Sequence, residues 1–79
     1  MIFIDKESKI PIYQQIYEFI KKEIEKEQLR PGDKLPSSRA LSRYLSVSRS
    51  TTDLAYDQLT SEGYIEAIPC RSEERRVGK

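Results

Sequence analysis

Isoleucine recurs at every fourth position in the first third of the chain. These isoleucines are Ile12, Ile16, Ile20 and Ile24. A four-residue spacing is close to the helical period, and charged side chains fall on the other faces, so the pattern predicts an amphipathic helix over residues 11–27. Pro11 suits a first helical turn, and Pro31 disfavours helical geometry in the residue before it. The helix is therefore expected to end near residue 28.

A turn and a short extended piece follow this helix. Residues 31–33 read Pro-Gly-Asp, a composition typical of turns, and residues 34–36 read Lys-Leu-Pro. Leu35 is the only side chain of the extended piece that can anchor to a core. Ser37 or Ser38 then supplies a side-chain oxygen that caps the start of a second helix.

The second helix is short and has an apolar face. The members of that face are Ala40, Leu41, Tyr44 and Leu45. The helix stops at residues 46–48, Ser-Val-Ser, and Ser48 is the expected N-cap of a third helix. Only three residues therefore link the two helices.

The third helix is expected over residues 49–62, with Gly63 in left-handed geometry at its end. Its inward face comprises Thr52, Ala55, Tyr56 and Leu59. Leu54 lies between the two faces, and the pattern assigns it to neither. Residues 64–68, Tyr-Ile-Glu-Ala-Ile, have the β-branched and aromatic content of a strand, which Pro69 closes.

Two short helices joined by a three-residue turn form the arrangement in which one helix enters a DNA major groove while the other braces it. Helical hairpins also occur in proteins that never touch DNA. The periodicity thus leaves two functions open, DNA binding and a helical protein-interaction or dimerisation module built on the helix of residues 11–27.

The residues at the start of the third helix favour DNA. Ser48, Arg49, Ser50 and Thr51 carry side chains that can bind phosphates and base edges, and an arginine can pair bidentately with guanine. Arg39, near the start of the second helix, can reach a phosphate. The plainer alternatives are that Ser48 only caps its helix and that the arginines are solvated or form weak surface ion pairs.

Composition excludes several function classes. The 79 residues make one small domain, and they include no histidine, no tryptophan and a single cysteine. A histidine-based metal or acid–base site and an internal disulfide are therefore impossible, and we expect no enzyme activity and no bound cofactor. The amino-terminal apolar run is too short for a signal peptide, and no segment has the length of a membrane span. A cytoplasmic location without membrane contact is expected.

The net charge of +1 hides an uneven distribution. Residues 71–79 contain four of the fourteen basic and two of the thirteen acidic side chains, so residues 1–70 carry a net charge of −1. General attraction to phosphate is therefore missing from the body of the domain. DNA binding would have to use a local patch, and a homodimer is expected for the same reason.

Several ordered motifs resemble a known family. They are PIYQQIY from residue 11, the block LxPGDKLPSSRxL from residue 29, VSRSTT from residue 47 and AYDQLxxEGY from residue 55. Together they are similar to the winged helix-turn-helix DNA-binding domain of GntR-type bacterial transcription regulators. The chain looks most similar to the MocR branch, whose members carry a second, aminotransferase-like domain that holds pyridoxal 5′-phosphate. No part of that second domain is encoded in these residues, so a third possibility is an inactive fragment of such a regulator.

The resemblance implies a mainly α fold, a three-helix core with a short β-wing, acting in sequence-specific binding of double-stranded DNA and in transcription regulation. It places the DNA contacts on Arg39, Ser48, Arg49, Ser50 and Thr51, with the third helix in the major groove. Asp53 is a departure, because some relatives have a basic residue there that contacts DNA. A carboxylate would repel phosphate, so Asp53 is not counted among the contacts.

The largest departure from the family pattern lies at the carboxyl-terminal end. The family wing commonly reads Pro-Gly-x-Gly and returns as an apolar strand, whereas Pro69 is followed by Cys70 and by a segment with six charged residues in nine. That segment is not expected to form a return strand, so the wing is expected to be incomplete. We therefore divide the chain into a winged-helix domain, residues 1–69, and a charged tail, residues 70–79, of non-native origin such as a frameshift or vector junction. The competing interpretation is a basic wing that grips phosphates.

Overall fold

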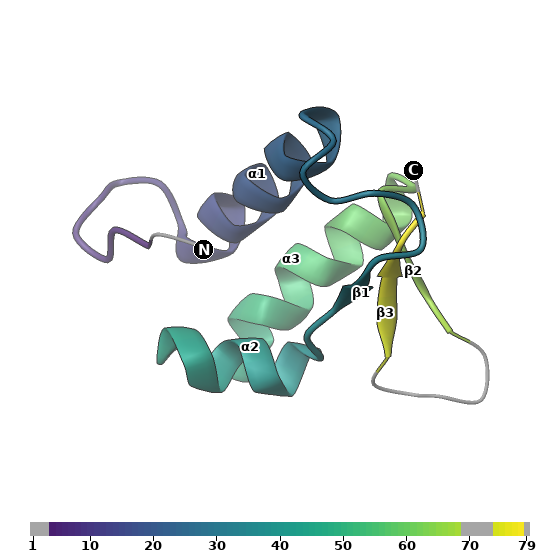
Figure 1. Ribbon diagram of the computed structural model, residues 1–79. Coiled ribbons are helices and arrows are strands. Elements are labelled where there is room, and N and C mark those ends of the chain that lie inside the picture. The colour runs from purple at the N-terminus through teal and green to yellow at the C-terminus, as the bar shows by residue number, and fades with distance from the viewer. Residues whose placement is uncertain (1–3, 69–73, 79) are drawn as a thin grey trace.

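The computed structural model describes residues 4–68 and 74–78. It contains three helices and a three-stranded antiparallel sheet (Figure 1). The elements are α1 (Ile12–Glu25), β1 (Lys34–Leu35), α2 (Ser38–Leu45), α3 (Arg49–Ser61), β2 (Ile65–Ala67) and β3 (Arg75–Val77). The predicted winged-helix architecture is confirmed. Pro69, which the sequence predicts to close the strand, and Cys70 lie outside the described residues.

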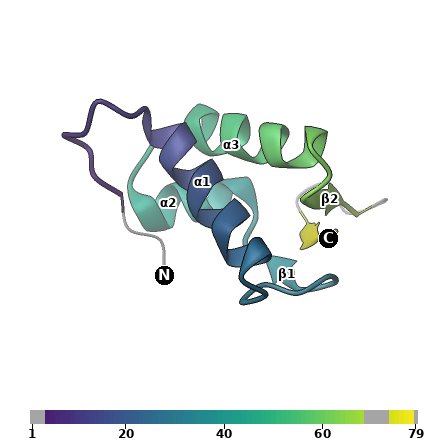
Figure 2. The same ribbon diagram turned by 90° about the horizontal axis from the view of Figure 1, so that it is seen from above.

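The third helix occupies the middle of the molecule. α1 packs on one side of α3 and α2 on another, while β2 contacts its carboxyl-terminal end (Figure 1). The view from above shows the sheet at the opposite end of the molecule from the amino-terminal segment (Figure 2). The start of α3 lies beside α2, at the end of the helix away from β2 (Figure 1).

One core joins all the elements. Its buried members are Ile16, Tyr17, Ile20, Ile24, Leu35, Leu41, Ala55, Tyr56, Leu59, Ile65 and Val77. The isoleucine face of α1 and the inward face of α3 are confirmed, and both follow from the helical period. The anchor at Leu35 is also confirmed, because it is the one apolar side chain of the extended piece. Leu54, which the pattern left unassigned, is 54% exposed.

The predicted inward face of α2 is partly wrong. Leu41 is buried, but Tyr44 is 60% exposed and Ala40 is also exposed. The buried positions beside Leu41 are polar, Ser38 and Ser42, and each finds a hydrogen-bond partner, so burial costs them little. The four apolar residues do lie on one side of a helix, and Leu45 packs against the core, but the buried face of α2 is centred on Ser38, Leu41 and Ser42.

The expectation that the charged tail forms no return strand is also wrong. β3 lies in the centre of the sheet, antiparallel to both β1 and β2, with Val77 opposite Ile65. Val77 is 1% exposed. Because side chains alternate along a strand, Arg76 faces away from Val77, whereas Arg75 shares the face of Val77 and is half-buried. One fully buried apolar side chain is therefore enough to anchor this three-residue strand. The wing is thus paired on both sides, and β2 does not depend on β1 as a partner.

A buried tyrosine joins α3 to the extended piece before α2. Tyr56 is 2% exposed, and its hydroxyl donates a hydrogen bond of 2.6 Å to the carbonyl oxygen of Pro36. Burial raises the pKa of Tyr56 well above its usual value. Because the pKa is higher in the folded state than in the unfolded state, the protonated Tyr56 hydroxyl stabilises the fold. This stabilisation is fully present below the unfolded-state pKa, about 10, and is lost as pH rises above it.

Replacing Tyr56 tests whether its raised pKa makes stability fall at alkaline pH. We expect Tyr56→Phe to cost about 1 kcal/mol at neutral pH, because the Pro36 carbonyl loses its donor. Between about pH 9 and pH 11, Tm should decrease less with rising pH in this variant than in wild type. Tyr44→Phe is the control, since Tyr44 is exposed, and it should follow the wild-type curve. Equal alkaline slopes for wild type and Tyr56→Phe would contradict this interpretation.

Candidate nucleic-acid interface

The link between α2 and α3 has the three residues that the sequence predicts. The C-cap of α2 is Ser46, which adopts left-handed geometry with φ 57°, and the N–H of Val47 donates to the Ser42 carbonyl at 3.0 Å. Ser48 follows in extended geometry as the N-cap of α3, which begins at Arg49. The tight link closes the last turn of α2 and brings the start of α3 close to it.

Ser48 is the N-cap of α3, as predicted. Its Oγ accepts a hydrogen bond of 3.3 Å from the Thr51 N–H and lies 2.7 Å from the Thr51 hydroxyl and 3.1 Å from that of Ser50. Ser37, rather than Ser38, caps α2 and accepts from the Ala40 N–H at 3.1 Å. The hydroxyls at the start of α3 therefore form one local cluster on the surface, and capping is a role that Ser48 fulfils in the folded chain.

A buried hydroxyl pair fixes the start of α3 against the start of α2. The Ser38 and Thr52 hydroxyl oxygens are 2.7 Å apart, and the Thr52 hydroxyl lies within hydrogen-bond distance of the carbonyl oxygens of Ser38 (3.0 Å) and Arg49 (2.9 Å). Thr52 is fully buried and Ser38 is 8% exposed. Bonds of this kind are strengthened by exclusion of water, so the two helix starts form a rigid junction.

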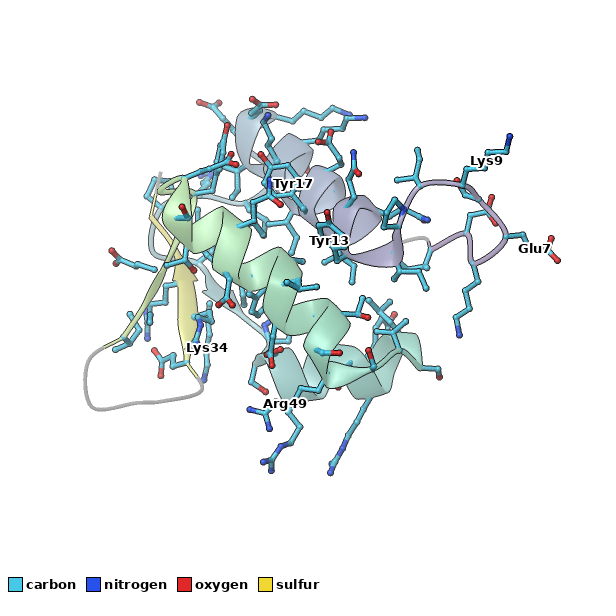
Figure 3. All side chains as sticks on the ribbon, turned by 180° about the vertical axis from the view of Figure 1, so that it is seen from behind. Glu7, Lys9, Tyr13, Tyr17, Lys34 and Arg49 are labelled. Carbon is cyan, nitrogen blue, oxygen red and sulfur yellow. The ribbon has the colours of Figure 1, made fainter. Side chains whose placement is uncertain are left out.

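The two predicted arginines lie on either side of this junction. Arg39 follows Ser38 in α2 and is exposed, and Arg49 is the first residue of α3 with a half-exposed side chain. Figure 3 shows Arg49 extending from the start of α3, away from Tyr13 and Tyr17 of α1. The five predicted contact residues are therefore gathered at the starts of α2 and α3, although they come from two separate segments of the sequence.

Sequence reasoning missed the part that Asp53 plays at this end. Its Oδ1 accepts a hydrogen bond from the Ser38 hydroxyl, and its Oδ2 lies 4.0 Å from Nε of Arg49. The four-residue spacing of Arg49 and Asp53 on a helix could have indicated the pair. The contact with Ser38 has no sequence signal, because Ser38 and Asp53 belong to different helices.

A second missed residue lies beside the helix link. Lys6, in the segment before α1, donates from Nζ to the carbonyl oxygen of Ser46 at 3.1 Å. The segment is held by Gln15 of α1, whose side chain bonds the backbone N–H and carbonyl of Asp5 and the carbonyl of Ile10. A cation at the carboxyl-terminal end of α2 is favourable because carbonyl groups there lack helical partners. This places one more positive charge beside the helix-turn-helix.

The described residues offer no other evident chemistry. None of the helices in the two described stretches is both long and apolar enough to cross a membrane. Across residues 4–68 and 74–78, no group of three or more His, Cys, Asp or Glu side chains is placed to hold a metal ion. The starts of α2 and α3 are thus the feature on which a functional assignment depends.

Curated relatives share this domain over a small part of their length. The chain is 49% identical over 67 residues to the uncharacterised HTH-type transcriptional regulator YhdI of Bacillus subtilis, a match that covers 85% of this chain and 14% of YhdI. It is 36% identical over 67 residues to the probable rhizopine catabolism regulatory protein MocR of Rhizobium meliloti, again covering 85% of this chain and 14% of the relative. The chain therefore spans about one seventh of the length of these relatives.

Solved structures have the same fold. YtrA from Sulfolobus acidocaldarius, a GntR-family transcription factor, superposes with a TM-score of 0.89 at 44% identity, covering 99% of this chain and 80% of that one. The AraR DNA-binding domain in complex with operator ORE1 matches with a TM-score of 0.75 at 26% identity, over 98% and 92% of the two chains. The family model "Bacterial regulatory proteins, gntR family" matches residues 12–72. The chain therefore belongs to the gntR family of bacterial regulatory proteins.

Proposed function

We propose that this chain binds double-stranded DNA sequence-specifically and thereby regulates transcription. The observation that carries the proposal is the rigid junction of Ser38 and Thr52, which gathers the predicted contact residues at one exposed end. Family membership and the likeness to an operator-bound AraR domain support it. These relatives are regulators rather than enzymes, and the composition offers no catalytic centre.

In the proposed complex the start of α3 enters the major groove. Arg49 reads a base edge, and Ser48, Ser50 and Thr51 donate to phosphates or base edges. Arg39 binds a phosphate and fixes the angle at which the domain docks. The whole chain carries a net charge of only +1, so affinity comes from these local groups.

We also propose that the chain acts as a homodimer in the cytoplasm. A single small interface with few cations gives little affinity, and helix-turn-helix domains commonly gain affinity by binding two half-sites with two copies. Operators for this chain would then be inverted or direct repeats. A dimer in sedimentation experiments on the DNA complex, with one domain per half-site, is the expected stoichiometry.

A more specific assignment is membership of the MocR branch. Two observations support it: the 36% identity to MocR, and the fact that the match covers the same small share, 14%, of MocR and of YhdI. The 43% identity to the repressor YtrA of Bacillus subtilis favours another branch. In that branch pyridoxal 5′-phosphate would be held by a second domain, and we propose no site for it among the described residues. The non-native origin of residues 70–79 also stays a proposal, although its premise that this segment forms no return strand does not hold. Sequencing the source gene in independent isolates would test it.

A protein-interaction module is the alternative function, and one observation favours it. An apolar groove of about 550 Å³ lies between α1, β1 and α2. Phe19, Leu35 and Tyr44 are among its lining residues, and Tyr44 is exposed. An interaction module would nevertheless have no use for a cluster of hydroxyls and arginines at the starts of two helices.

A titration against DNA tests the proposed function. Duplexes are selected from a randomised pool by the wild-type chain, and affinity for the enriched duplex and for a scrambled duplex is measured by fluorescence anisotropy over a range of salt. The proposal expects a preference of about 10³-fold or more for the enriched duplex, together with affinity that falls as salt rises. Failure to enrich any sequence, or equal affinity for both duplexes, would contradict sequence-specific binding.

A further inference from the structure

The carboxylate of Asp53 connects the buried junction to the exposed arginine of the interface. We propose that Asp53 is a positioning residue that makes the Arg49 contact specific for base edges. This inference rests on the proposed DNA-binding function. It reverses the expectation from sequence that an acidic side chain at this position only weakens the interface.

Asp53 is held from the inside of the molecule. The Ser38 hydroxyl donates to Oδ1, and that hydroxyl is itself placed by Thr52, 2.7 Å away and fully buried. A side chain that is bonded to a buried group loses most of its freedom to rotate. Oδ2 therefore has a defined place at the start of α3, one turn after Arg49.

Oδ2 in turn faces Arg49. The distance of 4.0 Å to Nε is at the limit of an ion pair, and both side chains are about half exposed, 50% for Arg49 and 48% for Asp53. A pair with this exposure adds little to stability. The pair instead orients the guanidinium group of Arg49. A carboxylate at the Nε side leaves the two Nη groups directed outward along the side chain, where they can pair with O6 and N7 of guanine.

The charge of Asp53 also acts on the DNA backbone. A carboxylate at the start of α3 repels phosphates that approach this turn, whether or not the sequence is correct. This repulsion lowers the affinity for every duplex alike, so by itself it leaves the ratio of the two affinities unchanged. Discrimination depends on the difference between the two binding free energies, and Asp53 increases that difference through the Arg49 base contact that it orients.

The test is a double-mutant cycle on the selected duplex and a scrambled duplex. Asp53→Asn removes the charge and keeps an oxygen that can accept from Ser38, so the fold is retained. We expect it to raise affinity for the scrambled duplex and to lower the ratio of selected to scrambled affinity by up to about fivefold, the factor that corresponds to the upper range of exposed charge pairs. In an Arg49→Ala background the ratio should no longer respond to Asp53→Asn, because the two residues act as one unit.

A matched control and a DNA-free measurement complete the design. Asp57→Asn removes the same charge one turn further along α3, at an exposed position, and should leave the ratio within about twofold of wild type. In the free protein, the NMR resonance of the Arg49 Nε–H should shift in Asp53→Asn and stay in place in Asp57→Asn.

Three outcomes would overturn the inference. The first is an unchanged Arg49 Nε–H resonance in Asp53→Asn, and the second is an equal drop in the ratio with and without Arg49. The third is a drop in Asp57→Asn as large as in Asp53→Asn. If wild type prefers no duplex, the proposed function fails and the resonance alone decides whether Asp53 positions Arg49.

Discussion

Replacing Leu59 by alanine is expected to lower the free energy of unfolding by about 2–5 kcal/mol. Leu59 is fully buried in the core where α3 meets α1 and β2. The substitution removes apolar contacts and leaves a cavity that its neighbours fill only partly. Small domains have a total stability of roughly 5–15 kcal/mol, so urea denaturation followed by circular dichroism should show a large loss of folded protein.

Leu54 provides the control on the same helix. Its side chain is 54% exposed, so Leu54→Ala should change the free energy of unfolding by no more than about 0.5 kcal/mol. The comparison separates burial from helix propensity, since both variants make the same chemical change in α3. Similar losses for the two variants would mean that α3 does not pack with its Thr52, Ala55, Tyr56 and Leu59 face inward.

Replacing Arg49 by alanine is expected to weaken binding to the selected duplex by about 1–3 kcal/mol, the range for loss of a bidentate contact with a base. The free energy of unfolding should change little, because the Arg49 pair with Asp53 is exposed. The measurement is an anisotropy titration at fixed salt, with denaturation of the same preparations. Loss of affinity without loss of stability separates an interface role from a structural one.

A cation far from the interface serves as the control for charge. Lys26 is the exposed C-cap residue of α1, and Lys26→Ala removes one positive charge, as Arg49→Ala does. It should leave the affinity for the selected duplex within about twofold of wild type, since exposed charges beyond a Debye length are screened. Unchanged affinity in Arg49→Ala, or an equal loss in Lys26→Ala, would rule out the assigned role of Arg49.

Elements with a clear period could be predicted from the sequence. The isoleucines of α1 and the inward face of α3 each repeat over several turns, and Gly63 adopts the predicted left-handed geometry with φ 82°. The structure differs from these predictions where an element is too short to show a period, or where contacts with other elements determine which side chains are buried. α2 has only eight residues, and its buried serines depend on partners in α3 and in its own backbone. β3 forms because one valine, Val77, fits beside Ile65 in the core.

The candidate site also has a part that the sequence predicts and a part that it does not. Residue types and their position at helix starts were enough to select Arg39, Arg49 and the hydroxyls near them, and a resemblance in sequence motifs indicated the same residues. The arrangement itself depends on Ser38, Thr52 and Asp53, which join two helices and have no local signal. Sequence reasoning therefore found the groups that can touch DNA but missed those that hold them in place.

The most direct test of the central claim uses Arg49→Lys. Lysine keeps the positive charge at the start of α3 but lacks the planar fork that pairs with two acceptors of one base. If Arg49 reads a base edge, the variant will bind a scrambled duplex as wild type does and will lose about tenfold or more of the preference for the selected duplex, at every salt concentration. If Arg49→Lys keeps the full preference, the start of α3 does not read bases through Arg49, and the account is contradicted.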